Sequence, residues 1–387
     1  MGGITLENVA EIMKLIEGGL NQDVTKVYNY SQLLISKVEA TGDVKTAKRL
    51  KSVINKSSKN EPMKSKEFSS LLKLPVDSES RLPLAEFKKY DEGSIFLSVD
   101  ENLKSRIDEF IFLLSNADLF AKKGIRTHRT MLLYGEPGTG KTQIARYIAS
   151  VTNLPLVVVR LDGIISSYLG STSKNIRMLF DFVNRTPCIL FLDEFDAIAK
   201  MRDDTNELGE LKRVVNALLQ NIDSMDSEIP VIAATNHKHL LDPAIWRRFD
   251  YKIQTKIPDQ LMRENMIKRF LGGITPPPEI LKLLVILTEG QSGSDIETFC
   301  NQIRTYLIVD DKETLEFKNV FNYYIKYKRG TDQNVDDIGI FQFKLDLASR
   351  LRKLDKKTFT YRTLARLSGI SSGKLSQEIR KGGDKIA

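Results

Sequence analysis

The chain has few of the residues that build disulfide scaffolds or zinc centres. Its 387 residues include two cysteines and three histidines. Cys188 and Cys300 both lie in apolar stretches, which predicts reduced core residues and argues against a disulfide or metal pair. His128, His237 and His239 are too few and too scattered along the chain for a zinc site.

Long apolar runs are also absent. No run approaches the roughly 20 residues that a membrane-spanning helix needs. The first residues, Met1–Leu6, have neither the basic start nor the apolar centre of a secretory signal. We therefore expect a cytoplasmic protein. The apolar fraction of 41% is close to that of globular proteins, and 387 residues are enough for two or three domains.

The most informative segment that is present has the sequence GEPGTGKT. It follows the apolar run Met131–Tyr134 and precedes a helical pattern, which is the strand–loop–helix context of a P-loop. Glycines let successive N–H groups surround phosphate oxygens, and the helix directs the positive end of its dipole at the same anion. The segment predicts a nucleoside triphosphate site. Its candidate binding residues are Gly135, Glu136, Pro137, Gly138, Thr139, Gly140, Lys141 and Thr142.

Four side chains have separate predicted roles at this site. Lys141 can reach the β- and γ-phosphates of ATP, and the Thr142 hydroxyl can hold Mg²⁺. Asp193 and Glu194 follow the apolar run Cys188–Leu192, which is typical of a parallel strand covered on both faces. At the carboxyl end of that strand, Asp193 is predicted to hold the hydration shell of Mg²⁺ and Glu194 to polarise the attacking water. The expected cofactors are therefore ATP and Mg²⁺.

Three further segments distinguish this chain from P-loop proteins in general. Pro230–Asn236 reads as an apolar strand that ends in an amide suited to orienting water near a γ-phosphate. Arg247 and Arg248 are adjacent and come just before another apolar strand. Gly290–Ile296 opens a helix late in the chain.

In this order and spacing, the five segments resemble the AAA ATPase module, over about residues 95–328. The resemblance implies an ATPase in which Asn236 is sensor 1. It implies that Arg247 and Arg248 are arginine fingers that reach the nucleotide of a neighbouring subunit, in a homo-oligomer that is normally a hexamer. The adjacent arginines are similar to the clade that includes katanin and spastin. Glu136 departs from the proline usual in the family, which puts the nucleotide affinity in question.

Tyr168, Leu169 and Gly170 lie between the second predicted strand and its helix. In AAA proteins that thread polypeptide, an aromatic–aliphatic–glycine loop at this place lines the central pore, and this segment resembles it. An aromatic ring offers a large contact area to whatever side chain passes. The resemblance therefore implies a polypeptide substrate or adaptor as partner. The alternative is a tyrosine packed in an ordinary loop.

The predicted fold class is α/β: a P-loop parallel sheet with helices on both faces, followed by a small helical lid. The predicted divisions are a helical N-terminal domain for adaptor or substrate recruitment (1–60), a linker (61–94), the large nucleotide-binding subdomain (95–258), the lid (259–330) and a basic helical tail (331–387).

The tail contains a pattern typical of a helix–turn–helix, from Thr360 to Ile379. Residues 342–387 carry 12 Lys/Arg and 4 Asp/Glu, a net charge of +8 that equals the net charge of the whole chain. A localised basic patch is typical of a protein with a polyanionic partner. DNA is therefore one candidate partner of residues 342–387. A helical appendage that packs on the lid or on another protein is the alternative.

These patterns lead to one main hypothesis and two alternatives. The main hypothesis is an ATP-hydrolysing AAA motor that assembles into a ring and remodels or unfolds proteins by threading them through a central pore. The first alternative is a DNA-associated AAA ATPase that acts on DNA or DNA-bound complexes through its tail. The second is a nucleotide-gated switch, which would need neither Glu194 nor the arginine pair.

Overall fold

The computed structural model describes most of the chain in two compact units. The described residues are 8–21, 23–57, 74–77, 81, 83–125, 129–161, 169–197, 210–225, 229–241, 243–312, 314–316, 319–320, 322–324, 327 and 337–383. The first unit comprises Met1–Leu97, Glu101–Glu136 and Lys141–Thr255, and the second comprises Ser98–Asp100, Pro137–Gly140 and Lys256–Ala387.

A six-stranded sheet forms the centre of the first unit. Its strands are β1 (Glu86–Lys88), β2 (Thr130–Gly135), β3 (Leu156–Arg160), β4 (Ile189–Asp193), β5 (Val231–Thr235) and β6 (Tyr251–Thr255). Their order across the sheet is β1-β3-β4-β5-β2-β6, and every neighbouring pair except β1 with β3 is parallel. The predicted α/β class with a P-loop parallel sheet is confirmed.

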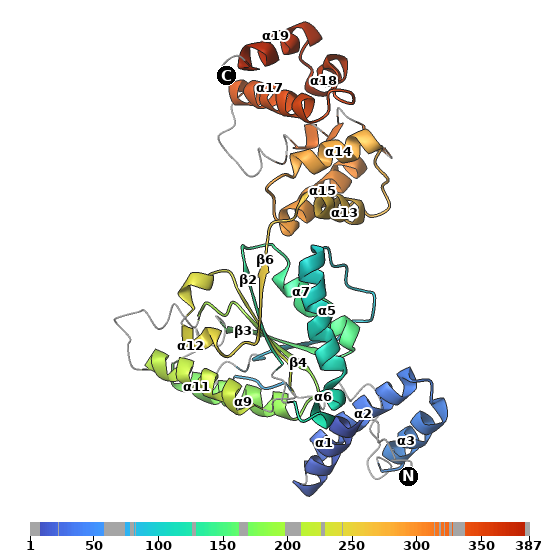
Figure 1. Cartoon of the computed structure of the whole chain (residues 1–387), viewed down its shortest axis with the longest axis vertical. Coiled ribbons are helices and arrows are strands. Elements are labelled where there is room, and N and C mark those ends of the chain that lie inside the picture. The colour runs from blue at the N-terminus through green and yellow to red at the C-terminus, as the bar shows by residue number, and fades with distance from the viewer. Residues whose placement is uncertain are drawn as a thin grey trace. The chain divides into compact units, whose positions relative to one another are not determined.

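Helices cover both faces of this sheet (Figure 1). Helices α9 (Leu169–Asn184) and α11 (Glu210–Ser224) pack on one face, and α5 (Glu101–Ser115) and α7 (Lys141–Thr152) pack on the other. Alternate side chains of a strand point to opposite faces. Leu190 and Leu192 of β4 accordingly join the core beneath α9 and α11, while Phe191, which is equally buried, faces the other layer.

Part of the segment predicted as a linker belongs to the sheet. Strand β1 pairs antiparallel with β3, with Phe87 opposite Val157, and the preceding Leu84 and Ala85 are buried in the core. A strand of three residues has too little periodicity to be predicted from sequence, because its pairing with a distant strand defines it. Residues 61–73, 78–80 and 82 of the predicted linker lie outside the described residues.

Within the described part of the chain, three helices precede the sheet: α1 (Val9–Leu20), α2 (Val24–Ala40) and α3 (Val44–Ser57). Helix α1 packs on α2 and also contacts α6 (Ala117–Lys122). Two polar contacts connect α2 and its amino end to the chain just after α9. Asn29 Nδ2 donates to the Arg185 carbonyl at 3.1 Å, and the Asp23 carboxylate pairs with Arg185 Nε at 3.3 Å. In this structure the amino-terminal helices are therefore part of the same unit as the sheet.

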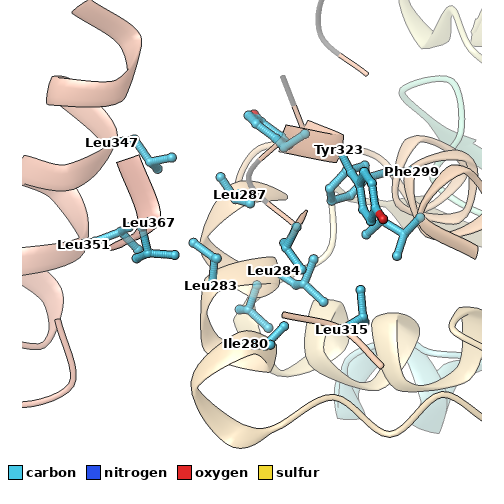
Figure 2. Close-up of a cluster of buried hydrophobic side chains, with 14 of the residues drawn as sticks. Ile280, Leu283, Leu284, Leu287, Phe299, Leu315, Tyr323, Leu347, Leu351 and Leu367 are labelled. Carbon is cyan, nitrogen blue, oxygen red and sulfur yellow. The ribbon is translucent and has the colours of Figure 1, made fainter. Parts of the chain in front are cut away.

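The second unit is helical. After Lys256 it contains α13 (Gln260–Phe270), α14 (Pro278–Leu287), α15 (Gly293–Val309), α17 (Asp337–Leu354), α18 (Tyr361–Ser368) and α19 (Ser372–Gly383). One apolar core includes residues of all six helices. Figure 2 shows Leu351 and Leu367 pointing toward Leu283 of α14. The predicted lid and the predicted tail thus share a core.

The described residues include both cysteines and the helices given above. Among their helices, none is long and apolar enough to cross a membrane. Cys188 and Cys300 are both buried and unpaired, and burial raises the pKa of each thiol to about 12. Both thiols are therefore protonated at neutral pH, as expected of core residues.

Candidate functional site

The glycine-rich loop lies between β2 and α7, and two of its glycines have no room for a side chain. At Gly135, with φ of 154°, an added Cβ would lie 2.2 Å from the Thr255 carbonyl oxygen. At Gly138, with φ of 73°, an added Cβ would lie 2.2 Å from Ser294 Oγ and 2.5 Å from Ser292 Oγ. Both positions also have backbone conformations that glycine adopts most readily. The loop is therefore fixed by close packing on both sides.

Lys141 is the first residue of α7 and its side chain is largely buried. The ammonium donates to the carbonyl oxygens of Gly135 and Glu136, both at 2.8 Å. Burial lowers the pKa of Lys141 to about 8, while the carboxylates of Asp193 and Asp196 oppose that shift. The charge on Lys141 therefore lies at the loop, in a place where an anionic ligand would favour its protonated form.

Thr142, Asp193 and Glu194 come together at the carboxyl edge of the sheet. The Thr142 hydroxyl donates to Asp193 Oδ2 at 3.3 Å, although the two residues are on different elements. The other oxygen, Asp193 Oδ1, accepts a hydrogen bond from the main-chain N–H of Glu194 at 3.0 Å. This arrangement places a hydroxyl and a carboxylate oxygen side by side at the start of α7.

Glu194 has a left-handed backbone, with φ of 54°. A residue other than glycine adopts this conformation at a cost of order 1–3 kcal/mol, so its neighbours must hold it there. They do so through three main-chain groups. The Glu194 N–H is bonded to Asp193, the Phe195 N–H donates to the Ala234 carbonyl at 2.8 Å, and the Glu194 carbonyl accepts from the Ala197 N–H at 2.9 Å. The direction of the Glu194 side chain is thus set by the ends of β4 and β5.

Strand β5 lies between the strand that precedes the loop and the strand that ends in Asp193. Its last residue, Thr235, is buried and its hydroxyl donates to Asp196 Oδ1 at 3.1 Å. The same hydroxyl accepts from the His237 N–H at 3.0 Å, which shapes the turn that carries Asn236. Asn236 itself is exposed at this edge. The position of β5 therefore brings Asn236 to the same edge as the loop and Glu194.

Arg247 and Arg248 follow the short helix α12 (Pro243–Trp246) and have different surroundings. Arg247 is exposed. Arg248 forms a bidentate pair with Asp223 of α11, through Nε to Oδ1 at 2.7 Å and Nη2 to Oδ2 at 2.8 Å, and it also donates to the Ala244 carbonyl at 2.8 Å. Such two-pronged geometry fixes the guanidinium plane. The two adjacent arginines are thus held differently within one chain.

The oxygen donors at the edge fit a magnesium ion. Mg²⁺ prefers oxygen ligands and is usually held by one or two carboxylates or hydroxyls together with substrate phosphates. The Thr142 hydroxyl and the Asp193 carboxylate, 3.3 Å apart, supply such a pair. Within the described residues, no group of three or more His, Cys, Asp or Glu could hold a metal by itself.

In the second unit, the segment Gly290–Ile296 meets the glycine-rich loop. Ser292 caps α15 in a capping box with Asp295, and the Ser294 N–H donates to the Gly138 carbonyl at 3.3 Å. The hydroxyls of Ser292 and Ser294 lie 3.0 Å apart beside Gly138. The helix predicted to open at this segment does so at Gly293. Its first turn is therefore in direct contact with the loop.

The segment predicted to line a pore falls mostly outside the described residues. Tyr168 is not described, whereas Leu169 and Gly170 form the first turn of α9 and so are helical. Sequence reasoning also missed two carboxylates with defined partners, Asp196 on Thr235 and Asp223 on Arg248. Asp196 is only two residues from Glu194 and could have been suspected from its acidic neighbours, whereas nothing local marks Asp223.

The fold and this edge define a P-loop nucleotide-binding α/β domain. Residues 131–257 match the family model described as "ATPase family associated with various cellular activities (AAA)". The part of the chain that forms the sheet is therefore similar to the AAA ATPase family.

Several curated proteins are similar to more than half of the chain. It is 41% identical over 200 residues to an uncharacterized AAA family ATPase of Sinorhizobium fredii, which covers 52% of this chain and 60% of that protein. It is 35% identical over 235 residues to a 26S proteasome regulatory subunit 10B homolog of Arabidopsis thaliana, covering 58% and 59%. It is 32% identical over 250 residues to a proteasome-activating nucleotidase of Methanopyrus kandleri, covering 62% and 57%. The chain thus spans about three fifths of the length of these relatives, and the narrower likeness to katanin and spastin stays a prediction.

Proposed function

We propose that this protein is an ATP-hydrolysing AAA motor that assembles into a ring and remodels proteins. One observation carries the ATPase part of the proposal. The hydroxyl of Thr142 at the start of α7 meets the carboxylate of Asp193 at the end of β4, and Glu194 follows in a backbone conformation held by its neighbours. The residues that we propose to hold Mg²⁺ and to activate water are therefore adjacent at one edge of the sheet.

Each residue of this edge has a proposed task in phosphoryl transfer. Lys141 and the loop from Gly135 to Gly140 bind the β- and γ-phosphates, and Thr142 and Asp193 hold Mg²⁺, which neutralises charge on the phosphates when bound. Glu194 accepts a proton from the attacking water. Asn236, exposed beside it, orients that water near the γ-phosphate. Lys141 must leave its carbonyl partners or share its protons with the phosphates to act in this way.

In the proposed ring, each ATP site receives arginines from the neighbouring subunit. Arg247 and Arg248 are proposed as arginine fingers because charge that develops on a transferred phosphoryl group is stabilised by a guanidinium placed beside it. Arg247 is exposed and can extend across an interface, whereas Arg248 is oriented by Asp223 of its own chain. We assign the larger share of contact with the neighbouring nucleotide to Arg247.

A polypeptide is the proposed substrate. This part of the proposal is supported by the likeness to proteins whose names say that they activate or regulate the proteasome, together with the resemblance of Tyr168 and Leu169 to a pore loop. The amino-terminal helices α1–α3 are proposed to recruit substrate or adaptor.

The test of this proposal compares two variants of the full chain. Glu194→Gln should bind Mg-ATP and lose turnover by on the order of 10²–10⁴-fold, because it removes the base and leaves Thr142 and Asp193 in place. Lys141→Ala should lose binding itself. ATP hydrolysis and binding of a fluorescent ATP analogue would be measured with and without an unfolded polypeptide. Turnover of Glu194→Gln near that of the wild type would show that Glu194 is not the base. If polypeptide leaves ATP hydrolysis by the wild type unchanged, that result would contradict a polypeptide substrate.

A second candidate function is favoured by one specific observation. Helices α18 and α19 are joined by a three-residue turn at Gly369, Ile370 and Ser371, as the helix–turn–helix pattern predicts. An ATPase that acts on DNA or DNA-bound complexes through this tail would share the same ATP site. Stimulation of ATP hydrolysis by duplex DNA and not by polypeptide would favour it over the first candidate.

A further inference from the structure

The three last helices form a packed unit with a defined outer face. Helix α18 begins after Thr360, whose hydroxyl accepts from the Thr363 N–H at 3.1 Å, and it ends at Gly369, which has φ of 71°. The left-handed glycine turns the chain into α19. The side chains that fix the angle between the two helices are buried, and they are Leu364, Leu367, Ile370 and Leu375.

The outer face of α19 is polar and carries no exposed acid among its described residues. Ser371, Ser372, Gly373 and Lys374 are consecutive and all exposed, and the Lys374 ammonium lies over the Phe341 ring of α17, 4.6 Å from its centroid. Gln377, three residues after Lys374, is exposed on the same side of the helix. Glu378 is partly buried. This face therefore offers hydrogen-bond donors and acceptors, and Lys374 adds a positive charge.

Exposed basic side chains also lie on α18 and at the end of α17, while Asp355 is engaged within the unit. Arg362 and Arg366 lie one turn apart on α18, and Lys353, Lys356 and Lys357 are exposed at the end of α17 and the loop after it. Asp355 in that loop accepts from Thr358 and pairs with Lys282, and these contacts hold the pKa of its carboxyl well below the usual range. Residues 342–387 thus carry an excess of basic over acidic residues, with 12 Lys/Arg against 4 Asp/Glu.

The structure also shows why this face points away from the rest of the second unit. The side of α17 that meets α14 carries Leu347 and Leu351, and the ion pairs Lys282–Asp355 and Arg350–Glu289 flank that contact. α19 itself packs on α17 and α18. The helices are therefore anchored through one side and leave the first turn of α19 accessible.

We propose that α18 and α19 bind double-stranded DNA and that α19 reads base edges in the major groove. In a helix–turn–helix, the amino-terminal residues of the second helix contact base edges while the first helix crosses the phosphate backbone. Gln377 is proposed to read adenine, and Lys374 to read guanine once its ammonium leaves the Phe341 ring, since glutamine pairs with adenine and lysine with guanine in that groove. Arg362 and Arg366 contact phosphates. This inference rests on the second candidate function and specifies its partner and its reading residues.

Duplex DNA fits this face better than a single strand does. Single-strand binding depends on aromatic side chains on which successive bases stack. The described residues of α19 include no aromatic residue, and Tyr361 of α18 lies beneath the Arg352 guanidinium, 3.9 Å from its ring centroid. The exposed face has hydrogen-bonding groups in place of stacking surfaces. We therefore expect a preference for duplex over single strand.

The experiment uses the full chain and labelled DNA. A pool of random-sequence duplexes of about two helical turns would be selected for binding, and the enriched duplex, a random duplex and a random single strand would be compared by fluorescence anisotropy at several salt concentrations. Arg362→Ala with Arg366→Ala should weaken binding to both duplexes alike and reduce the salt slope by about one unit for each lost phosphate contact. Lys374→Ala with Gln377→Ala should abolish the preference for the enriched duplex, a loss of about tenfold or more in discrimination.

A matched control removes two positive charges elsewhere. Lys45 and Lys48 are exposed on α3, so Lys45→Ala with Lys48→Ala should leave both the affinity and the preference unchanged. A midpoint temperature of thermal unfolding equal to that of the wild type would show that each variant keeps the fold. The ATPase activity of each variant is measured in parallel, so that the motor is tested separately.

Each outcome decides between the proposals. No binding to any duplex at low salt would overturn both this inference and the second candidate function. Duplex binding without an enriched sequence, or an unchanged preference in the Lys374 and Gln377 variant, would overturn base reading and leave non-specific DNA binding in place. Stronger binding to the single strand would also overturn the inference. These DNA-binding results do not test the first candidate function, which the polypeptide assay tests.

Discussion

At the proposed ATP site, the charge on Lys141 depends on pH. Its ammonium is buried against two carbonyl oxygens, and its pKa is lowered to about 8 mainly because burial disfavours the charged form. Phosphates beside the ammonium would raise that pKa again. The lysine is therefore close to losing its proton in the slightly alkaline range before ATP binds, and fully charged afterwards.

The first prediction follows from this difference between the two states. Above pH 8, binding of ATP should be accompanied by uptake of up to one proton by Lys141, because the bound state favours the charged amine. The dissociation constant should rise by at most about tenfold per pH unit in that range. Below pH 7 this residue should contribute no pH dependence. Titration calorimetry at pH 6.5 and pH 9, in buffers of different ionisation enthalpy, measures the uptake, and equal proton counts at both values would contradict the prediction.

The second prediction concerns Arg248 and Asp223. If their ion pair positions the segment that carries Arg247, the variants Arg248→Ala and Asp223→Ala should lower kcat by similar factors. The double variant should then be little worse than either single one, because residues in direct contact are strongly coupled. If Arg248 instead acts mainly on the neighbouring nucleotide, its loss should cost on the order of 10³-fold or more while Asp223→Ala stays near wild type. Measuring kcat for the wild type, the two single variants and the double variant separates the two roles.

At the scale of helices and strands, the apolar core of the second unit joins α14 and α15 to α17 and α18. Leu351 of α17 is 2% exposed, whereas Leu354, three residues on, is 63% exposed. Removing buried methyl groups costs about 2–5 kcal/mol, while an exposed substitution changes stability by roughly 0.5 kcal/mol or less. The two leucines therefore form a matched pair of test positions on one helix.

The third prediction is that Leu351→Ala destabilises α14 as well as α17. Hydrogen exchange of the α14 amides should become faster in Leu351→Ala, because the cavity lies in the core that both helices share. Leu354→Ala should leave exchange in α14 unchanged. If α17–α19 fold independently of the lid helices, Leu351→Ala would speed exchange in α17–α19 only. Deleting residues 337–387 would expose the same apolar surface of α14, so a truncation is a poor test of the tail alone.

The elements that the sequence predicts well are those whose signal is local. A run of apolar residues followed by glycines, or by Asp193 and Glu194, identifies β2 and β4 and the edge at which they end, because strand, turn and charge are adjacent in the chain. Strand β1 has no such signal, since its three residues become a strand only through pairing with β3. The contact of Asp223 with Arg248 is equally non-local, as it depends on how α11 and α12 pack. Burial of the Thr235–Asp196 pair also depends on strand order, which composition does not encode.

For the whole molecule, the proposed ring would bring the arginines of one subunit to the proposed ATP site of its neighbour. A head-to-tail interface repeats around a ring, so each subunit would lend its arginines to one neighbour and receive them from the other. Hydrolysis should then depend on protein concentration, because the active site is complete only in the oligomer.

The fourth prediction concerns whether Arg247 acts on the nucleotide of a neighbouring subunit. The test mixes two inactive variants. Arg247→Ala subunits keep Lys141 and their own ATP site, whereas Lys141→Ala subunits keep Arg247. In a randomly mixed ring at equal amounts, about one quarter of the interfaces would join an intact ATP site to an intact arginine, since each interface is heterologous. ATPase activity should therefore recover on mixing, with a maximum near equal amounts, while each variant alone stays inactive. Mass spectrometry of the assemblies would establish that mixed oligomers form, and mixed oligomers without any recovery of hydrolysis would show that Arg247 acts within its own subunit.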